Sequence, residues 1–265
     1  MLYLLKFGGN ALDGREGMLR LAGEVADMVR DGHRVVMVHG GGPEISAEME
    51  RRGMHPRKVA GVRVTDEESL DVAELVLRRI NADAVACLQE KGVDALGIPG
   101  WFCTVCTRRP PVQADGGTVD LGLVGDVSGT DPSSIMDLLD DGIVPVIYPI
   151  GRDAEGRRLN VNADTMAAGV AAGIGADEMI AITDVPGILR DVGDPSSKVD
   201  EATLEDIDAL IDDGTISGGM LPKVEACRRA LLAGAGAVRM VDGRSGGPIV
   251  ADAVKGVPCG TLIRR

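Results

Sequence analysis

Two asparagines and an aspartate occupy alternate positions where an apolar run gives way to small residues: Asn160, Asn162 and Asp164. Alternate residues of an extended segment point the same way, so Asn160 and Asn162 can face one side together. Asp164 then lies in the first turn of the following helix, where the helix dipole favours its charge and it can orient cationic side chains. A polar turn with a helix N-cap is the simpler interpretation of these residues.

Two glycine turns follow apolar runs that have the length of short strands. The first is Lys6-Phe7-Gly8-Gly9, and the second is Gly40-Gly41-Gly42-Pro43, which opens a helical pattern. Glycines let a ligand approach the backbone closely, and free N–H groups at a helix N-terminus bind anions. Neither turn is a P-loop or a dinucleotide-binding fingerprint. His39 precedes the second turn, and we expect it to pack or cap rather than to catalyse.

Three cationic side chains stand where they could bind such an anion. Lys6 lies at the end of the first predicted strand, where open α/β sheets bind ligands. Arg63 stands just before a capping-box pattern at 65–68, and its guanidinium could grip a carboxylate through two hydrogen bonds. Lys223 lies at a predicted helix start, where the dipole disfavours a cation, which suggests an anion nearby. Solvated surface positions are the alternative for each of them.

The elements that must position these residues alternate along the chain. Strand-length apolar runs and helical patterns follow one another almost throughout, and glycine-rich turns end the strands. This alternation predicts an α/β fold, a three-layer αβα sandwich with a mostly parallel open sheet, in one domain over 1–265. We expect one buried strand at 143–150, helices at 65–80 and 82–91, and hairpins at 101–127 that could cover a site.

The bulk composition excludes several kinds of partner. The net charge of −13 argues against nucleic acid and against an anionic membrane surface. Only 2% of the residues are aromatic, so platforms for stacking bases are nearly unavailable. No apolar run is long enough to span a bilayer, and no signal-peptide pattern opens the sequence, so we expect a cytoplasmic protein.

The cysteines do not indicate a metal or redox centre. Their odd number of five and irregular spacing argue against a disulfide framework. Cys103 and Cys106 form a CxxC pair, but zinc would need a second pair of ligands. The pair also does not open a helix after a strand, as a thioredoxin-like motif would. We therefore expect two thiols on a loop or hairpin, and no metal held by protein side chains.

The chain resembles the amino-acid kinase family, and within it the acetylglutamate kinases, through seven short stretches in the family's order. These stretches are 6–11, 39–43, 61–65, 160–164, 183–187, 219–223 and 260–261. The resemblance spans nearly the whole chain. It implies transfer of the γ-phosphoryl group of ATP to the side-chain carboxylate of N-acetylglutamate, which gives an acyl phosphate. Mg²⁺ would be bound through the nucleotide phosphates.

The resemblance also implies roles for individual residues. Lys6 and Lys223 would neutralise charge on the transferring phosphoryl group, and Asp164 would orient both lysines. The positions that match the substrate site are Gly41, Gly42, Arg63, Asn160 and Asn162. The positions that match the nucleotide site are Gly8, Gly9, Thr183, Asp184, Gly187, Gly218, Gly219 and Met220. A lobe of about 1–158 would then bind the acid, and a lobe of about 159–265 the nucleotide.

Two other functions remain open at this point. The stretches 189–197 and 241–244 also resemble sibling kinases that act on aminoadipate or glutamate attached to a small acidic carrier protein. The charge of −13 opposes docking of such a carrier. A regulator that binds ATP or an amino acid without catalysis is the third possibility, because fold does not fix function. The sequence starts at its first strand, without the N-terminal helix of arginine-inhibited hexameric relatives, so we expect a homodimer without arginine feedback.

Overall fold

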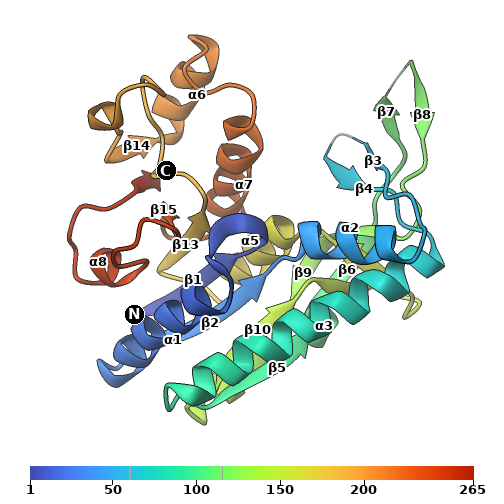
Figure 1. The fold of residues 1–265 in the computed structure, drawn as a ribbon, viewed down its shortest axis with the longest axis horizontal. Helices are drawn as coiled ribbons and strands as arrows, with labels where there is room; N and C mark the ends of the chain where they lie inside the picture. Colours follow the sequence, from blue (N-terminus) through green and yellow to red (C-terminus); the bar gives the residue numbers. More distant parts are fainter. Residues whose placement is uncertain (60, 115) are drawn as a thin grey trace.

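The computed structural model describes residues 1–59, 61–114 and 116–265, without the side chain of Asn10. The described residues form a central sheet of eight strands with helices on both faces (Figure 1). Its strands are, in spatial order, β14 (Glu201–Thr203), β16 (Thr261–Arg264), β15 (Val238–Asp242), β13 (Glu178–Thr183), β1 (Leu2–Phe7), β2 (Arg34–His39), β10 (Val144–Tyr148) and β5 (Ala95–Pro99). Neighbours are parallel except β15 and β16, which confirms the predicted mostly parallel sheet.

Side chains on the two faces of this sheet pack against different helices. Leu4 and Val36 face one core, and their neighbours Tyr3 and Val35 face the other, as the two-residue period of a strand requires. The first core is covered by α4 (Ser133–Asp140), α5 (Ala163–Gly173), α6 (Leu204–Asp212) and α7 (Met220–Ala233). The second is covered by α1 (Gly14–Arg30), α3 (Glu67–Glu90) and α8 (Ala251–Val254). The predicted three-layer αβα sandwich is therefore confirmed.

The chain also forms a second, smaller sheet and two hairpins, of which the sequence indicated only the hairpin within 101–127. The second sheet runs in the order β11 (Ile150–Arg152), β12 (Arg158–Val161), β9 (Val124–Thr130) and β6 (Thr104–Arg108). The hairpins are β3 (Lys58–Val59) with β4 (Val62–Arg63), and β7 (Val112–Ala114) with β8 (Gly117–Val119). Valines of the two hairpins pack in one small apolar cluster with Leu121 and Val124. Both hairpins lie at the upper right of Figure 1, above α2 (Gly42–Arg51).

Two expectations from the sequence are wrong in detail. The helices expected at 65–80 and 82–91 are one continuous helix, α3, and its N-cap is Asp66, whose side chain accepts from the Ser69 N–H. The strand expected at 143–150 is split between two sheets, because Pro149, which has no N–H for a sheet ladder, separates β10 from β11. The hairpins expected at 101–127 exist as β6 to β9, with Asp115 outside the described residues.

Among the described helices, none is long and apolar enough to cross a membrane.

His39 fixes the end of β2, from which the second glycine turn starts. Its side chain is buried, its Nδ1 donates to the Gly40 carbonyl at 2.8 Å, and its Nε2 accepts from the Asn81 amide at 3.1 Å. Burial lowers the pKa of His39 to about 4. A second ring proton would also face the N–H of Asn81. His39 is therefore a neutral packing residue, as expected from the sequence.

We predict that His39 makes the protein less stable in mild acid. In the unfolded chain His39 is protonated below about pH 6.5, whereas in the folded chain it stays neutral down to about pH 4. The free energy of unfolding therefore falls as the pH drops from about 6.5 to about 4. His39→Gln should remove a drop of about 2–3 kcal/mol in unfolding free energy between pH 7 and 4.5. Urea denaturation at both pH values measures this drop, and His55→Gln, at an exposed position, is the control. Equal drops in the wild type and His39→Gln would contradict the assignment.

Candidate functional site

Two cavities meet at the carboxyl edge of the central sheet. The first, of about 250 Å³, lies between β1, β13 and α7, and the second, of about 280 Å³, lies between the two glycine turns, β4 and β12. Lys6, Gly8 and Asp164 line both of them. Two ligands that occupied the cavities together would therefore meet at these three residues.

Lys6 and Asp164 form an ion pair at this junction. Lys6 is the last residue but one of β1, Asp164 lies in the first turn of α5, and Lys6 Nζ is 2.7 Å from Asp164 Oδ1. Asn162 caps α5, because its side-chain oxygen accepts from the backbone N–H groups of Asp164 at 2.7 Å and Thr165 at 3.3 Å. The N-cap interpretation of Asn162 is therefore confirmed. Because the cap fixes the turn that carries Asp164, it is compatible with a role for Asp164 in the site.

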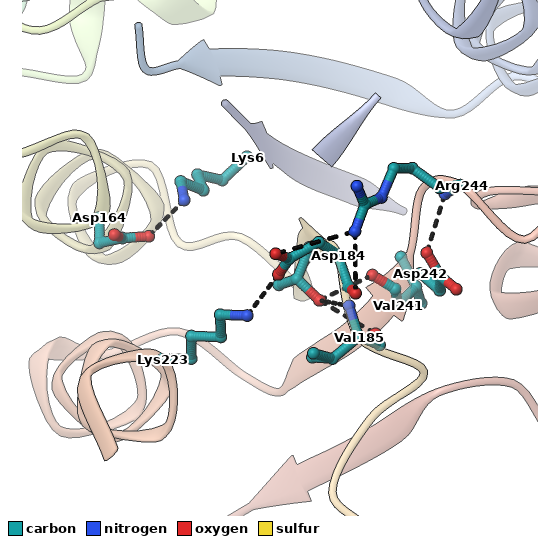
Figure 2. Close-up of polar contacts among 9 residues, drawn as sticks. Lys6, Asp164, Asp184, Val185, Lys223, Val241, Asp242 and Arg244 are labelled. Carbon is teal, nitrogen blue, oxygen red and sulfur yellow. Dashed lines mark hydrogen bonds and ion pairs between the residues drawn. The ribbon is translucent and has the colours of Figure 1, made fainter. Parts of the chain in front are cut away.

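Lys223 lines the first cavity together with Lys6, and Figure 2 shows it beside Asp184. It lies in the first turns of α7 and forms an ion pair with Asp184, the residue after β13. Hydrogen bonding to Lys223 lowers the pKa of Asp184, and Arg244 Nη2 lies 3.9 Å from the same carboxylate. No ion pair joins Lys223 to Asp164 in the part of the chain described here. In this ligand-free structure each lysine pairs with a different aspartate, so the expectation that Asp164 orients both lysines stays a prediction.

The two glycine turns pack against each other, and at Gly8 and Gly41 they leave no room for a side chain. A Cβ on Gly8 would lie 2.8 Å from Gly40 N, and a Cβ on Gly41 would lie 2.7 Å from Ile80 Cδ1. Gly42 begins α2, and no described side chain caps this helix. Its first-turn N–H groups are thus available to an anion in the second cavity, as the sequence predicts.

Arg63 lines the second cavity and is held in place by neighbouring groups. The side chain is buried, and its Nη2 donates to the Gly42 carbonyl at 3.0 Å and to Ser46 Oγ at 2.8 Å. Its Nη1 contacts Met49 Sδ at 3.2 Å. Burial lowers the pKa of Arg63, although a guanidinium stays protonated in proteins. Asn160 lines the same cavity. The second cavity therefore presents a fixed cation, an amide and helix N–H groups.

Only some of the residues expected at the nucleotide site line the first cavity. Thr183 and Asp184 line the first cavity. Gly187 instead packs closely on Thr261, since a Cβ there would lie 2.6 Å from Thr261 Oγ1. Gly218 and Gly219 form the turn before α7, and Met220 is its first residue and packs on the core. None of the last four residues lines either cavity.

The sequence did not indicate several residues of the two cavities. Lys58 of β3 lines the second cavity, and its only signal was its nearness to the stretch 61–65. The first cavity has an apolar wall made by Ala11, Met179, Ala181, Ile182, Pro222, Ala226, Cys227 and Met240. Burial raises the pKa of Cys227 to about 12, so its thiol is a packing group rather than a nucleophile. This aliphatic wall suits a planar, weakly polar ring.

The CxxC pair does not form a reactive centre. Cys103 and Cys106 are free thiols and are both buried. Burial raises the pKa of Cys103 to about 12, so very little thiolate exists at neutral pH. The described residues contain no group of three or more His, Cys, Asp or Glu side chains that could hold a metal ion.

Comparisons with known proteins agree with this geometry. A profile of the amino acid kinase family matches residues 1–242. An acetylglutamate kinase of Methanopyrus kandleri is 43% identical over 224 residues, which cover 82% of this chain and 91% of the relative. An acetylglutamate kinase of Methanothrix thermoacetophila is 38% identical over 265 residues, which cover 99% of this chain and 92% of the relative.

Solved structures share the fold at low sequence identity. The N-acetylglutamate synthase of Neisseria gonorrhoeae superposes with a TM-score of 0.82 at 22% identity, and the match covers this whole chain and 59% of that one. A carbamate kinase of Giardia superposes with a TM-score of 0.72 at 18% identity, and the match covers this whole chain and 98% of that one. By the family profile and the two kinase sequences, the chain belongs to the amino acid kinase family.

Proposed function

We propose that this protein transfers the γ-phosphoryl group of ATP to the side-chain carboxylate of N-acetyl-L-glutamate, as in arginine biosynthesis. The observation that carries the proposal is that two cavities share Lys6, Gly8 and Asp164, since two reactants must meet there. Relatives that are 43% and 38% identical over most of the chain are named acetylglutamate kinases, which supports the choice of acid.

Each cavity suits one reactant. The first has Lys6 and Lys223 for phosphates and an aliphatic wall for the adenine ring, so we assign it to ATP. The second has Arg63, Asn160 and the free helix N–H groups for a dicarboxylate, so we assign it to the acid. The acid cavity then includes Asn160 and Asn162 from beyond the acid lobe of about 1–158. The nucleotide cavity likewise combines Thr183, Asp184 and Lys223 with Lys6, Gly8 and Ala11 from beyond the nucleotide lobe of about 159–265.

The proposed reaction needs positioning and charge neutralisation rather than a base. The acid's side-chain carboxylate is already ionised at neutral pH, so its oxygen attacks the γ-phosphorus directly. The new P–O bond forms as the bond to the bridging oxygen breaks, and the electron pair stays on ADP. Lys6, Lys223 and the glycine N–H groups stabilise charge on the transferring group, while Asp164 orients Lys6. Mg²⁺ bound through the phosphates supplies further positive charge.

A carrier-bound acid is the second candidate substrate. A third cavity, of about 280 Å³, is lined by Asp164, Arg109 and Arg229. Two guanidinium groups beside the acid cavity could receive the acidic tail of a carrier protein. Arg109 already forms two hydrogen bonds with Asp126, at 2.8 and 2.6 Å, which weakens this candidate relative to the free acid.

We also propose that the protein is a cytoplasmic homodimer. β5 ends the central sheet and pairs only with β10 among the described strands, and Leu96 on it is exposed. Leu75 on the adjoining helix α3 is exposed as well. An open sheet edge with apolar side chains is a common site of self-association. Free thiols and the use of ATP fit the cytoplasm.

A hydroxamate assay tests the proposed function, because hydroxylamine traps acyl phosphates. Purified protein with ATP and Mg²⁺ should give product with N-acetylglutamate and little with glutamate, N-acetylaspartate or N-acetylaminoadipate. Product with another acid alone would change the substrate. Product only after a glutamate- or aminoadipate-loaded carrier is added would favour the second candidate. Binding of ATP without product from any acid or carrier would indicate a regulator and would overturn the proposal.

Lys223→Ala should lower kcat about 10²- to 10³-fold and change the KM for ATP far less, because the ammonium group acts on charge that develops during transfer. Steady-state kinetics measure both constants. Lys255→Ala, at an exposed position, is the control and should leave both unchanged. A wild-type kcat in Lys223→Ala would remove Lys223 from the mechanism.

Arg63→Ala should raise the KM for N-acetylglutamate about 10- to 100-fold, because a charge-assisted hydrogen-bonded pair with the α-carboxylate is lost. The KM for ATP should stay the same. Arg63→Lys should recover little, because one ammonium group cannot keep the hydrogen bonds to Gly42 and Ser46 and also reach the carboxylate. If both substrates bound equally more weakly, Arg63 would have a structural role instead.

A further inference from the structure

Thr65 connects Arg63 and Asn160, which both line the second cavity. It lies between β4 and α3, and its side chain is fully buried. Its hydroxyl donates to the Arg63 carbonyl at 2.9 Å, and the Asn160 amide donates to the same hydroxyl oxygen at 3.1 Å. Its backbone is fixed too, because Thr65 N donates to Leu121 O at 2.9 Å and Thr65 O accepts from Leu123 N at 2.7 Å.

The direction of these hydrogen bonds determines which way the Asn160 amide faces. A hydroxyl has one proton, and a backbone carbonyl can only accept, so the Thr65 proton goes to Arg63. Thr65 therefore offers Asn160 only a lone pair. The NH₂ end of the amide can match that lone pair and the carbonyl end cannot. The Asn160 carbonyl oxygen is thus turned away from Thr65, and it has no hydrogen-bond partner among the described residues.

We propose that Thr65 is a positioning residue that sets Asn160 to accept an N–H from the α-nitrogen of the substrate. This inference rests on the proposed function, in which Arg63 binds the α-carboxylate of the same ligand. Both groups line one cavity, and Thr65 joins the backbone of one to the side chain of the other. The site would then select acids that carry an N–H on the carbon next to the α-carboxylate. The acyl group itself must be recognised by other residues.

Binding measurements with an isosteric pair of ligands test this role. The ligands are N-acetylglutamate and 2-acetoxyglutarate, which replaces the N–H by an ester oxygen and would place two acceptors face to face. Calorimetry on the wild type should give about 10- to 100-fold weaker binding of the ester, as expected when a buried acceptor loses its donor. Calorimetry needs no turnover, so the result is independent of kcat.

Thr65→Val and Thr65→Ser form a matched pair of variants. Val keeps the shape but removes the hydroxyl, so the amide of Asn160 is free to turn, and the preference for N-acetylglutamate should fall to less than about threefold. Ser keeps the hydroxyl and should restore the preference. In kinetics, Thr65→Val should raise the KM for N-acetylglutamate and leave the KM for ATP unchanged. A similar melting temperature in all three proteins would show that folding is intact.

Three results would overturn the inference. Equal binding of the two ligands by the wild type would show that no acceptor faces the α-nitrogen, even if the hydroxamate assay confirmed the kinase. A wild-type preference in Thr65→Val would show that Asn160 is positioned without Thr65. Equal loss of preference in Thr65→Val and Thr65→Ser would assign the effect to packing. If the wild type bound neither ligand and gave no hydroxamate with N-acetylglutamate, the proposed function would fail as well.

Discussion

The ion pair between Lys6 and Asp164 is the interaction on which the rest of the site depends. Two anionic reactants can meet in a protein of net charge −13 only where local cations and N–H donors outweigh their repulsion. Lys6 supplies one such cation at the junction of both cavities, 2.7 Å from Asp164. The parallel sheet brings β1, β2 and β13 to the same edge, and the glycine turns after β1 and β2 leave the backbone open there.

The two sides of the junction differ in how completely they are organised without ligands. In the cavity that we propose for the acid, Arg63 is already held by Ser46 and by the Gly42 carbonyl, and Thr65 links it to Asn160. Such a preformed site loses little conformational entropy when the acid binds. In the cavity that we propose for the nucleotide, Lys223 pairs with Asp184 (Figure 2). Nucleotide phosphates offer Lys223 a more highly charged partner, so we expect ATP to draw it away from Asp184.

Local signals in the sequence predicted the layers of the fold and several of the residues that line the two cavities. Lys6, the glycine turns and the cap at Asn162 are short-range features at element ends, where residue type has a direct physical meaning. Contacts between distant segments were not predictable in this way. The Asn160–Thr65 hydrogen bond joins residues 95 positions apart, and the Lys223–Asp184 pair joins residues 39 apart. The second sheet was missed for the same reason, since β12 pairs with the distant β9, and only Pro149 marks the change of sheet.

The most direct test of the account is a crystal structure with N-acetylglutamate, Mg²⁺ and a nonhydrolysable ATP analogue. We expect the nucleotide in the cavity lined by Thr183 and Lys223, and the acid in the cavity lined by Arg63. The acid's side-chain carboxylate should then lie about 3–3.5 Å from the γ-phosphorus, next to Lys6. Ligands that bound in separate places, or an acid whose side-chain carboxylate faced away from Lys6, would contradict the central claim.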